Sequence, residues 1–412
     1  MKRVLVIAYH FPPLGGGGVF RTLSFTKYLP QFGYQPYVLT AKNPMYRPKD
    51  PTLLKEIPPE GKVYRTLSLE HRILRVPRRL FHVNLKWLYV PDENIGWLPT
   101  AVSAGANLIK RERIGAIYAT SPAWTSLLIG FLLKKKTEKP LIVDYRDPWT
   151  DNVFIKYPTQ VHRLIERKME EKVLSQADFV TVATESIKNS LRERYPFLKS
   201  KIETITNGFD PDDFKNVRIY PNPGKFRITF IGSIYGLLTA KPFLSALKEL
   251  FEENRNLREK MEARFVGNFG RETPKLVEEY GLKENVELID YVSHEKCIEH
   301  MMNSEALLLL ITIEGPGGEG ILTGKLFEYL ASRRPIIAIV PTKGLAAKII
   351  ESLDAGAVVS PRDIPSIKKA MSTFYEQWTK GDPFRGKGNI DVYNRKFLTQ
   401  ELAQIFDKVL GV

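Results

Sequence analysis

Residues 4–33 read VLVIAYHFPPLGGGGVFRTLSFTKYLPQFG, and this stretch decides how the chain folds. The apolar run 4–8 is typical of a buried β-strand. Residues 20–32 have the apolar spacing of a helix, and Gly33 is suited to end it. Between them, the four glycines 15–18 leave backbone N–H groups open to close approach. The stretch therefore predicts a strand, a glycine-rich turn and a helix, which together form the first unit of a parallel α/β sheet.

The same alternation of short apolar runs and helical patterns continues to the end of the chain. Further strands are expected at residues 35–40, 116–120, 141–145, 179–183 and 202–205, with helices at 100–111, 159–175 and 185–194. After a break rich in Pro, Asn and Gly at 207–224, strands are expected at 228–231, 263–266, 286–289, 306–311, 336–340 and 357–359. Helices are expected between them at 241–252, 274–280, 295–302, 324–332 and 345–352. This rhythm predicts parallel sheets with helices on both faces.

We therefore predict an α/β protein made of two doubly wound, Rossmann-like domains that face each other across a cleft. The first domain is expected to span residues 1–206 and the second 207–390, followed by a last helical segment at 391–412. A chain of 412 residues is long enough for two such domains, because one domain takes roughly 100–200 residues.

The amino-acid composition favours an anionic partner and excludes an internal disulfide. The formal net charge of +15 favours an anionic partner, such as nucleic acid, an acidic lipid surface or a phosphorylated substrate. Charge alone does not choose among them. Cys297 is the single cysteine, so an internal disulfide is impossible. No Cys/His cluster has zinc-binding spacing, and we expect no metal site.

Residues 114–133 carry no charged side chain and are long enough to cross a bilayer. Ser121-Pro122 interrupts the run, and we expect a strand at 116–120 followed by a buried helix at 124–133 instead. The sequence thus predicts a cytoplasmic protein. Contact with the inner face of the cell membrane stays open, because residues 71–90 combine five basic side chains with aromatic and aliphatic ones and contain no acid. The alternative is an ordinary helical face packed on its own domain.

Two strand ends in the first half carry candidate site residues. Gly15, Gly16, Gly17 and Gly18 start the first helix, where N–H groups and the helix dipole favour an anion, and Arg21 lies one turn further on. The loop matches neither the dinucleotide fingerprint nor the P-loop, and a plain tight turn is the alternative.

The second of these strand ends is the sequence Asp144-Tyr-Arg146-Asp147, which ends the strand expected at 141–145. Ligands of open α/β sheets bind beyond the carboxyl ends of strands. We therefore expect these three charged side chains to take part in catalysis. A local surface ion pair between Arg146 and Asp147 is the alternative.

In the second half, a glycine-rich loop leads into the helix expected at 324–332. The candidate residues there are Glu319, Thr323, Gly324, Lys325 and Glu328. The helix start is suited to a pyrophosphate, Lys325 to neutralising it, and Glu328 to accepting hydrogen bonds from a ribose. An exposed ion pair between Lys325 and Glu328 is the alternative. A further turn with Gly232, Ser233 and Lys241 is expected at the same sheet edge.

Taken together, these motifs resemble the GT-B glycosyltransferases of family 4, also termed group 1, whose members are retaining enzymes. The resemblance covers nearly the whole chain. It is carried by the following segments: Phe11-Pro-Pro-Leu-Gly-Gly-Gly-Gly18, Asp144-Tyr-Arg-Asp-Pro-Trp149, Thr206-Asn-Gly-Phe-Asp210, Phe230-Ile-Gly-Ser233, Arg264-Phe-Val-Gly267 and Gly324-Lys-Leu-Phe-Glu-Tyr329.

The resemblance implies a metal-independent enzyme without a cofactor, whose donor substrate is a nucleotide-diphosphate sugar. It implies that 15–18 approach the donor pyrophosphate and the acceptor, and that Asn207 lies near the hinge between an acceptor-binding and a donor-binding domain. Lys325 would contact the pyrophosphate and Glu328 the ribose. The last helix would cross back to the first domain. The implied acceptor is a sugar or lipid-linked sugar in polysaccharide or glycolipid biosynthesis.

The sequence departs from the family pattern at two places. The family often has two glutamates separated by seven residues, but Gly320 stands where the first is expected and Glu319 is one position off. Ser233 stands where the family commonly has Arg, and Lys241 or Lys325 would have to supply the charge. Two other functions stay open, a nucleotide-sugar epimerase of the same fold and a non-enzymatic basic module that binds an anionic surface. No nucleic-acid-binding motif is present.

Overall fold

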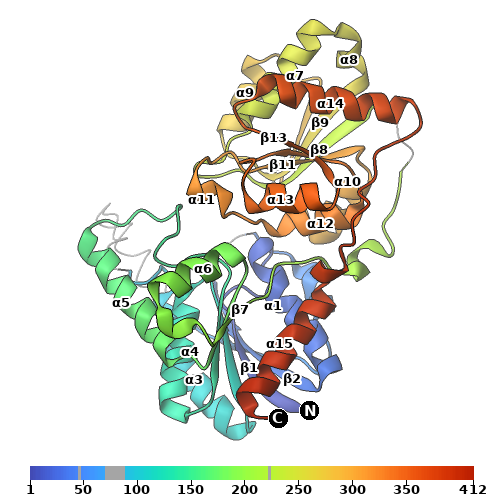
Figure 1. The fold of residues 1–412 in the computed structure, drawn as a ribbon. Helices are drawn as coiled ribbons and strands as arrows, with labels where there is room; N and C mark the ends of the chain where they lie inside the picture. The colour runs from blue at the N-terminus through green and yellow to red at the C-terminus, as the bar shows by residue number, and fades with distance from the viewer. Residues whose placement is uncertain (45–47, 70–88, 221–223) are drawn as a thin grey trace. The chain divides into compact units, whose positions relative to one another are not determined.

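The computed structural model describes residues 1–44, 48–69, 89–220 and 224–412. It divides the chain into two compact units. The first unit contains Met1–Asn207 together with Arg395–Val412, and the second contains Gly208–Asn394. Each unit is a parallel sheet with helices on both faces (Figure 1).

The first unit has a seven-stranded sheet in the order β3-β2-β1-β4-β5-β6-β7. Its strands are β1 Lys2–Ile7, β2 Tyr34–Ala41, β3 Lys62–Thr66, β4 Ala116–Thr120, β5 Leu141–Tyr145, β6 Phe179–Val182 and β7 Ile202–Thr204. Its helices are α1 Gly17–Tyr28, α3 Leu98–Arg111, α4 Trp124–Thr137, α5 Gln160–Gln176, α6 Glu185–Arg194 and α15 Arg395–Leu410. Short 3₁₀ helices are η1 Leu29–Phe32, η2 Pro51–Glu56, η4 Ile95–Trp97 and η5 Pro196–Leu198.

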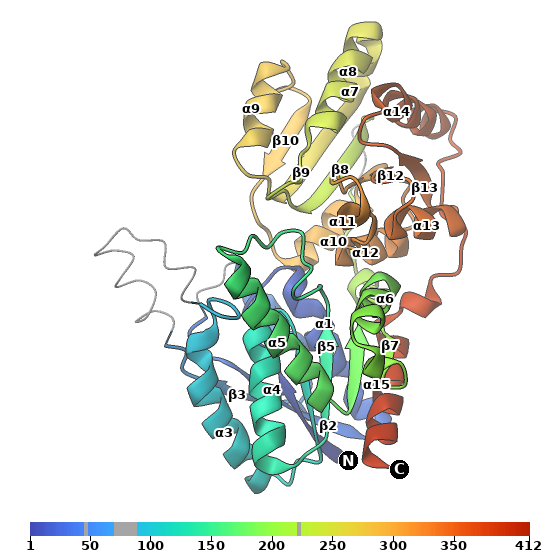
Figure 2. The same cartoon turned by 60° about the vertical axis from the view of Figure 1, so that its left-hand side comes forward.

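Alternate residues of the first strand feed two separate cores. Leu5 and Ile7 pack with residues of α3, α4 and α5, whereas Val4 and Val6 pack with residues of α1 and α15. This follows from the two-residue period of a strand, which points successive side chains to opposite faces. From Val4 to Ile7 the strand is apolar, because both of its faces are covered there. The expected doubly wound arrangement is confirmed in this unit (Figure 2).

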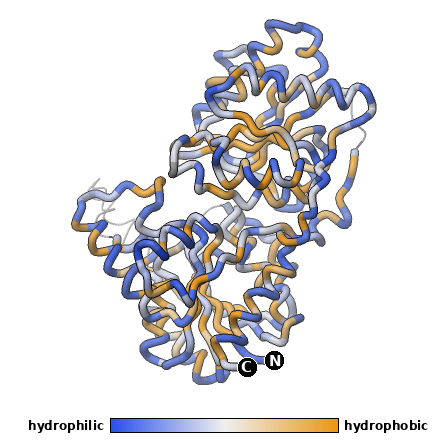
Figure 3. The backbone as a smooth tube through the Cα atoms, viewed as in Figure 1, coloured by the Kyte–Doolittle hydropathy of each residue, from blue (hydrophilic) through white to orange (hydrophobic). Residues whose placement is uncertain are grey.

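The second unit has a six-stranded sheet in the order β10-β9-β8-β11-β12-β13. Its strands are β8 Phe226–Ser233, β9 Met261–Asn268, β10 Val286–Ile289, β11 Ala306–Leu310, β12 Ile336–Ile339 and β13 Gly356–Val359. Its helices are α7 Lys241–Glu253, α8 Arg255–Lys260, α9 Glu272–Glu279, α10 His294–Met302, α11 Pro316–Glu319, α12 Gly324–Ser332, α13 Leu345–Ser352 and α14 Ile364–Thr379, with 3₁₀ helices η6 Pro211–Phe214 and η7 Asp391–Tyr393. Figure 3 shows the hydrophobic colouring gathered on its central strands.

Two features refine the expectations from sequence. Residues 114–133 form β4 and the first part of α4, as expected, and none of the described helices is long and apolar enough to cross a membrane. The strand β3 was not predicted. It is an edge strand whose Lys62 is exposed and whose remaining side chains are only half-buried, so it lacks the apolar run that marks the inner strands.

Candidate functional site

Both sheets have a point where the direction of winding reverses. In the second unit, β8 is bonded to β9 on one side and to β11 on the other, so the chain leaves these neighbouring strands toward opposite faces. Ligands of doubly wound folds bind outside the carboxyl ends of the strands at such a point. The segment 312–323 follows β11 there, and α12 begins directly after it.

Lys325 reaches from α12 back to the end of β8. Its ammonium nitrogen lies 4.2 Å from the centre of the Phe230 ring. A Cβ added to Gly232 would stand only 2.5 Å from that nitrogen, and Gly232 has a φ of 133°, which favours glycine. Two of the predicted groups, Gly232 and Lys325, are therefore brought together by the fold.

The environment of Lys325 disfavours its charged form. Burial lowers the pKa of Lys325 to about 8, while the nearby Glu328 carboxylate acts in the opposite direction. Glu328 lies one turn further along α12 and is 7% exposed. Glu328 is therefore largely withdrawn from water and Lys325 is half-buried. Charge–charge and hydrogen-bond interactions with a ligand are stronger in such an environment than in water.

Helix α12 is fixed on β8 through a residue that the sequence did not single out. The backbone N–H of Ile231 donates to the Tyr329 hydroxyl at 2.9 Å, and Tyr329 is fully buried. Leu326 and Phe327 on the same helix are also fully buried. A buried tyrosine usually has a hydrogen-bond partner, and here that partner is the backbone of β8.

The start of α12 is open to an anion. Thr323 precedes the helix but makes no capping hydrogen bond with its side chain, and no acidic residue lies in the first turn. Within the described ranges, the buried Thr323 Oγ1 has no hydrogen-bond partner. The first N–H groups of a helix have no partner within the helix, and they carry the positive end of its dipole.

The other candidates of the second unit lie around this point. Glu319 ends the short helix α11 and is half-buried, and Gly324 is the first residue of α12. Ser233 ends β8, and Lys241 begins α7, and both are exposed. The loop after β11 is tied to the loop before α7 by a hydrogen bond from the Thr239 N–H to the Thr312 hydroxyl at 2.9 Å.

A replacement of Gly232 tests how tightly Lys325 is placed. We expect Gly232→Ala to destabilise the fold by about 1–2 kcal/mol, since alanine is strained at this φ. We also expect the added methyl to displace the Lys325 ammonium and to lower kcat/KM for the reaction about tenfold. Chemical denaturation and steady-state kinetics on the same preparation measure both effects. An unchanged kcat/KM would show that the ammonium position is unimportant.

In the first unit, Asp144 and Arg21 are a buried pair. Arg21 Nε and Nη2 donate to the two Asp144 oxygens at 3.0 and 2.8 Å, and Arg21 Nη1 donates to the Thr206 carbonyl at 2.7 Å. Asp144 also accepts from the hydroxyls of Thr120 and Thr181, both at 2.7 Å. Both charged side chains are thereby occupied, so we treat them as positioning residues rather than as groups that contact substrate.

Removal of the Asp144 charge should destabilise the fold. Burial alone would raise the pKa of Asp144, but the Arg21 guanidinium and the Thr181 and Thr120 hydroxyls hold it below its usual value. Because the carboxyl pKa is lower in the folded protein than the unfolded value of 3.8, the ionised Asp144 stabilises the fold above pH 3.8. This stabilisation is lost as the pH falls below 3.8. We expect Asp144→Asn to reduce the free energy of unfolding by about 3–5 kcal/mol at pH 7. Chemical denaturation at pH 7 and pH 3 should give a smaller difference in unfolding free energy between the variant and the unchanged protein at pH 3. Equal differences would contradict the assignment.

Arg146 holds the backbone of the glycine loop in place. Its guanidinium donates to the carbonyls of Gly18 and Ser121 and, at 3.1 Å, to that of Pro122. Asp147 beside it is exposed. Of the three charged residues in and directly after the end of β5, Asp147 is therefore the one that is exposed.

The glycine loop itself is accessible at its tip. Gly16 caps α1 with a φ of 82°, and no side chain caps that helix. Gly17 is exposed, and a Cβ added to it would meet nothing within 4 Å, whereas one added to Gly18 would lie 3.3 Å from His10 Nδ1. The Gly15 N–H is taken by the Pro48 carbonyl at 2.9 Å. Burial and the charge of Arg146 lower the pKa of His10 to about 3, so His10 is neutral at pH 7.

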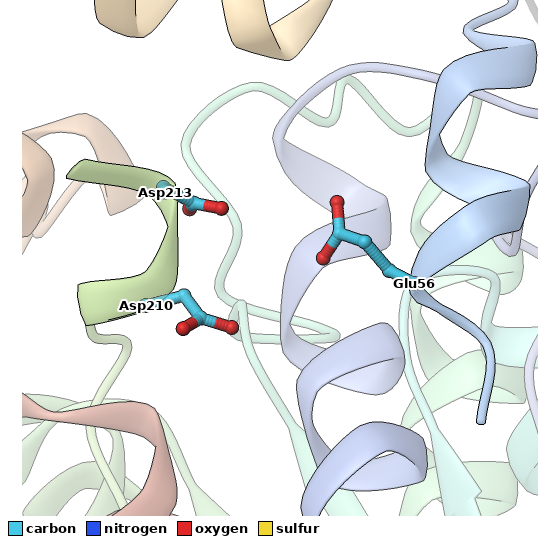
Figure 4. Close-up of side chains that lie close together, drawn as sticks. All are labelled: Glu56, Asp210 and Asp213. Atoms are coloured by element: carbon cyan, nitrogen blue, oxygen red, sulfur yellow. The ribbon is translucent and has the colours of Figure 1, made fainter. Parts of the chain in front are cut away.

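Asn207 is half-buried and ends the first segment of the first unit. Beyond it, Asp210 accepts a hydrogen bond from the Asp212 N–H at 3.0 Å, and Asp213 lies 2.9 Å from His294 Nε2. Figure 4 labels the side chains of Asp210 and Asp213. Figure 4 also labels Glu56, which ends η2 in the first unit. His294 therefore has a structural partner within the second unit. Most of the basic stretch 71–90 lies outside the described residues.

A hollow of the second unit, about 440 Å³ in volume, lies at the opposite edge of the sheet. It is lined by Arg227, Glu305 and Arg334 among others, which belong to the amino ends of β8, β11 and β12. None of the predicted donor-site residues lines it. The predicted donor-site residues therefore lie away from this hollow.

Comparison with known proteins gives a match in each half of the chain. A family model described as "Glycosyltransferase Family 4" matches residues 15–213, and one described as "Glycosyl transferases group 1" matches residues 225–377. A comparison with curated proteins finds no match.

Solved structures match over the full length of the chain at low sequence identity. Sucrose-phosphate synthase from Thermosynechococcus elongatus is 14% identical, with 100% of both chains covered and a TM-score of 0.69. HepE from Anabaena, in complex with UDP and glucose, is 13% identical, with 99% of this chain and 100% of that chain covered and a TM-score of 0.68. A putative UDP-N-acetylglucosamine 2-epimerase from Listeria monocytogenes is 12% identical, with 99% and 96% covered and a TM-score of 0.60.

Proposed function

Because this chain belongs to the glycosyltransferases of family 4 and group 1, we propose that it transfers a sugar from a nucleotide-diphosphate sugar to a hydroxyl acceptor with retention of the anomeric configuration. The fold agrees with that membership, since both units are doubly wound and the solved glycosyltransferases of GT-B fold match them. One observation carries the proposal. The uncapped start of α12, the Lys325 ammonium and the buried Glu328 converge where the second sheet reverses its winding.

The leaving diphosphate is the group that most needs stabilisation. When the anomeric C–O bond breaks, its electron pair passes to the diphosphate oxygen and leaves negative charge there. The N–H groups at the start of α12 and the Lys325 ammonium would meet that charge from fixed positions, in a partly dry environment. No metal is required by this arrangement, and we propose that transfer is metal-independent.

Glu328 is proposed to bind the ribose of the donor nucleotide. A carboxylate accepts hydrogen bonds from two neighbouring hydroxyl groups, and such charge-assisted bonds are strong when water is excluded. Lys325 and Glu328 would then hold adjacent parts of the same nucleotide. HepE, whose structure was solved with UDP and glucose, supports a nucleotide donor by likeness of fold.

The acceptor is proposed to bind the first unit. The accessible groups there are the exposed tip at Gly17 and the carboxylate of Asp147. Arg21, Asp144 and Arg146 would act by positioning the loop and the strand ends. We propose a sugar or lipid-linked sugar as acceptor, in cell-surface polysaccharide or glycolipid biosynthesis, with residues 71–90 contacting the inner face of the cell membrane.

Calorimetric titration with UDP, GDP and ADP tests the donor site directly. We expect saturable binding of at least one of them in the presence of EDTA, and a higher Tm on binding by mass action. Incubation of the matching nucleotide sugar without acceptor separates the alternative of an epimerase, which would convert the sugar. Absence of binding to all nucleotides would remove the basis of the proposal.

A further inference from the structure

Helix α5 buries two glutamates in its first three turns and exposes apolar side chains there. The inward face of α5 carries Glu166 and Glu170, which are 6% and 0% exposed, ahead of the buried Val173 and Leu174 near its end. Val161, Leu164 and Ile165 on the opposite face are 62%, 58% and 42% exposed. A surface helix of a soluble protein ordinarily turns its apolar stripe toward the core. This inverted order indicates that the outer face of α5 has a partner.

Hydrogen bonds fix α5 in this orientation. The Trp149 indole N–H donates to Glu166 at 2.9 Å. The Thr150 and Tyr195 hydroxyls donate to Glu170 at 2.8 and 3.0 Å. If the helix rotated so that its apolar stripe became buried, these bonds would break. The buried donors of Trp149, Thr150 and Tyr195 would then lose their partners, which is unfavourable. The exposure of the stripe is therefore built into the first unit.

The exposed apolar residues of α5 lie on one face of the helix. Val161, Leu164 and Ile165 have the i, i+3, i+4 spacing that places them on one face of the helix. The segment that leads to the helix carries two more exposed apolar residues, Val153 and Phe154. We call these five residues the α5 surface, and in Figure 2 the helix lies in front of α4. Single exposed apolar residues are normal, whereas a contiguous group marks a contact site.

Basic side chains outnumber acidic ones around the start of α5, where Glu171 and Asp151 are the exposed acids. Lys156, Arg163, Arg167 and Lys168 are all exposed. Arg163 lies 3.9 Å from Asp151, and the other three contribute positive charge beside the stripe. We propose that the α5 surface docks on a bilayer of anionic phospholipid, with its apolar side chains entering the boundary between headgroups and acyl chains. The bordering cations would contact the lipid phosphates.

Charge argues against a second copy of this chain as the partner. A two-fold contact through the α5 surface would bring the same patch of each copy together, so its basic border would face an equally basic border. Like charges placed opposite each other across an interface are unfavourable. The proposal does not depend on the donor site, and it concerns residues separate from 71–90.

Vesicle sedimentation tests the proposal. Full-length protein is mixed with vesicles of phosphatidylcholine alone or with 30% phosphatidylglycerol. We expect binding to the anionic vesicles, and at least about tenfold weaker binding for Val161→Ser/Leu164→Ser/Ile165→Ser, because three apolar side chains lose their contact. Arg167→Gln/Lys168→Gln should weaken binding about fivefold for each charge removed, with a smaller dependence on salt.

The control variant is Leu54→Ser/Leu67→Ser, which removes two exposed leucines elsewhere on the first unit. It should bind like the unchanged protein. Each variant should keep its Tm and its nucleotide titration, so failure here is distinct from failure of the donor site. Equal sedimentation of the triple variant and the unchanged protein would overturn the proposal, even if residues 71–90 bind lipid. A dimer in solution that the triple variant dissociates would assign the surface to a second copy instead.

Discussion

Replacement of Glu328 by alanine is expected to lower kcat/KM for sugar transfer by about a hundredfold or more. The carboxylate is proposed to accept two hydrogen bonds from the donor ribose, and each bond to a charged group contributes about 1.5–3 kcal/mol. Because the carboxylate is 7% exposed, water does not easily replace it. Steady-state kinetics with the nucleotide sugar found by titration measure the effect.

Glu328→Gln is the matched control for volume. Glutamine fills the same space and still accepts one hydrogen bond, so its kcat/KM should lie between those of the alanine variant and the unchanged protein. The Tm of both variants separates lost binding from lost structure. Full activity of the alanine variant with an unchanged Tm would exclude Glu328 from the donor site.

Replacement of Lys325 by methionine should remove transfer and yet leave the protein at least as stable at pH 7. Burial lowers the folded pKa to about 8 from the ordinary 10.5, so the folded state disfavours the ammonium that is present at pH 7. Methionine retains much of the apolar stem without the charge. If Lys325 served only to stabilise the fold, the methionine variant would keep its activity and lose stability.

The destabilising effect of the Lys325 charge should depend on pH. Between about pH 8 and pH 10.5 the unfolded chain binds more protons at Lys325 than the folded chain does, so the unchanged protein gains stability as the pH rises through that window. The stability advantage of the Lys325→Met variant over the unchanged protein should decrease as the pH rises through the same window. Thermal unfolding at pH 7, 9 and 10 measures it, and an advantage that widens would contradict the assigned pKa.

Activity should respond to the same proton. If the ammonium meets the leaving diphosphate, kcat/KM of the unchanged enzyme falls as the pH rises through about 8, since kcat/KM reports groups of the free enzyme. Lys325→Arg keeps its charge throughout this range, so its lower activity should stay level. A parallel fall in both proteins would assign the pH dependence to another group.

The strands and helices of the inner sheets could be predicted because their patterns are local. Residues 4–8 form part of a buried strand covered on both faces, so they read as one apolar run. The start of α12 at Gly324 was likewise predicted from the glycine-rich loop that precedes it. The edge strand β3 lacks such a pattern, because it has one exposed edge and charged side chains.

The contacts of the candidate site could not be predicted from local patterns. Arg21 and Asp144 are 123 positions apart, and only the fold shows that they occupy each other. The bond between Ile231 and Tyr329 joins residues 98 positions apart. The start of α5 is a third case. Val161, Leu164 and Ile165 have the spacing of a core-facing stripe, but the buried hydrogen bonds of Glu166 and Glu170 on the opposite face leave that stripe exposed.

A crystal structure of the second unit's donor site with its nucleotide sugar bound, in the full-length protein, tests the central claim most directly. We expect the diphosphate within hydrogen-bonding distance of the backbone N–H groups that begin α12 and of the Lys325 ammonium, with the ribose hydroxyls on Glu328. A nucleotide bound at the amino ends of the strands, away from α12, would contradict the account.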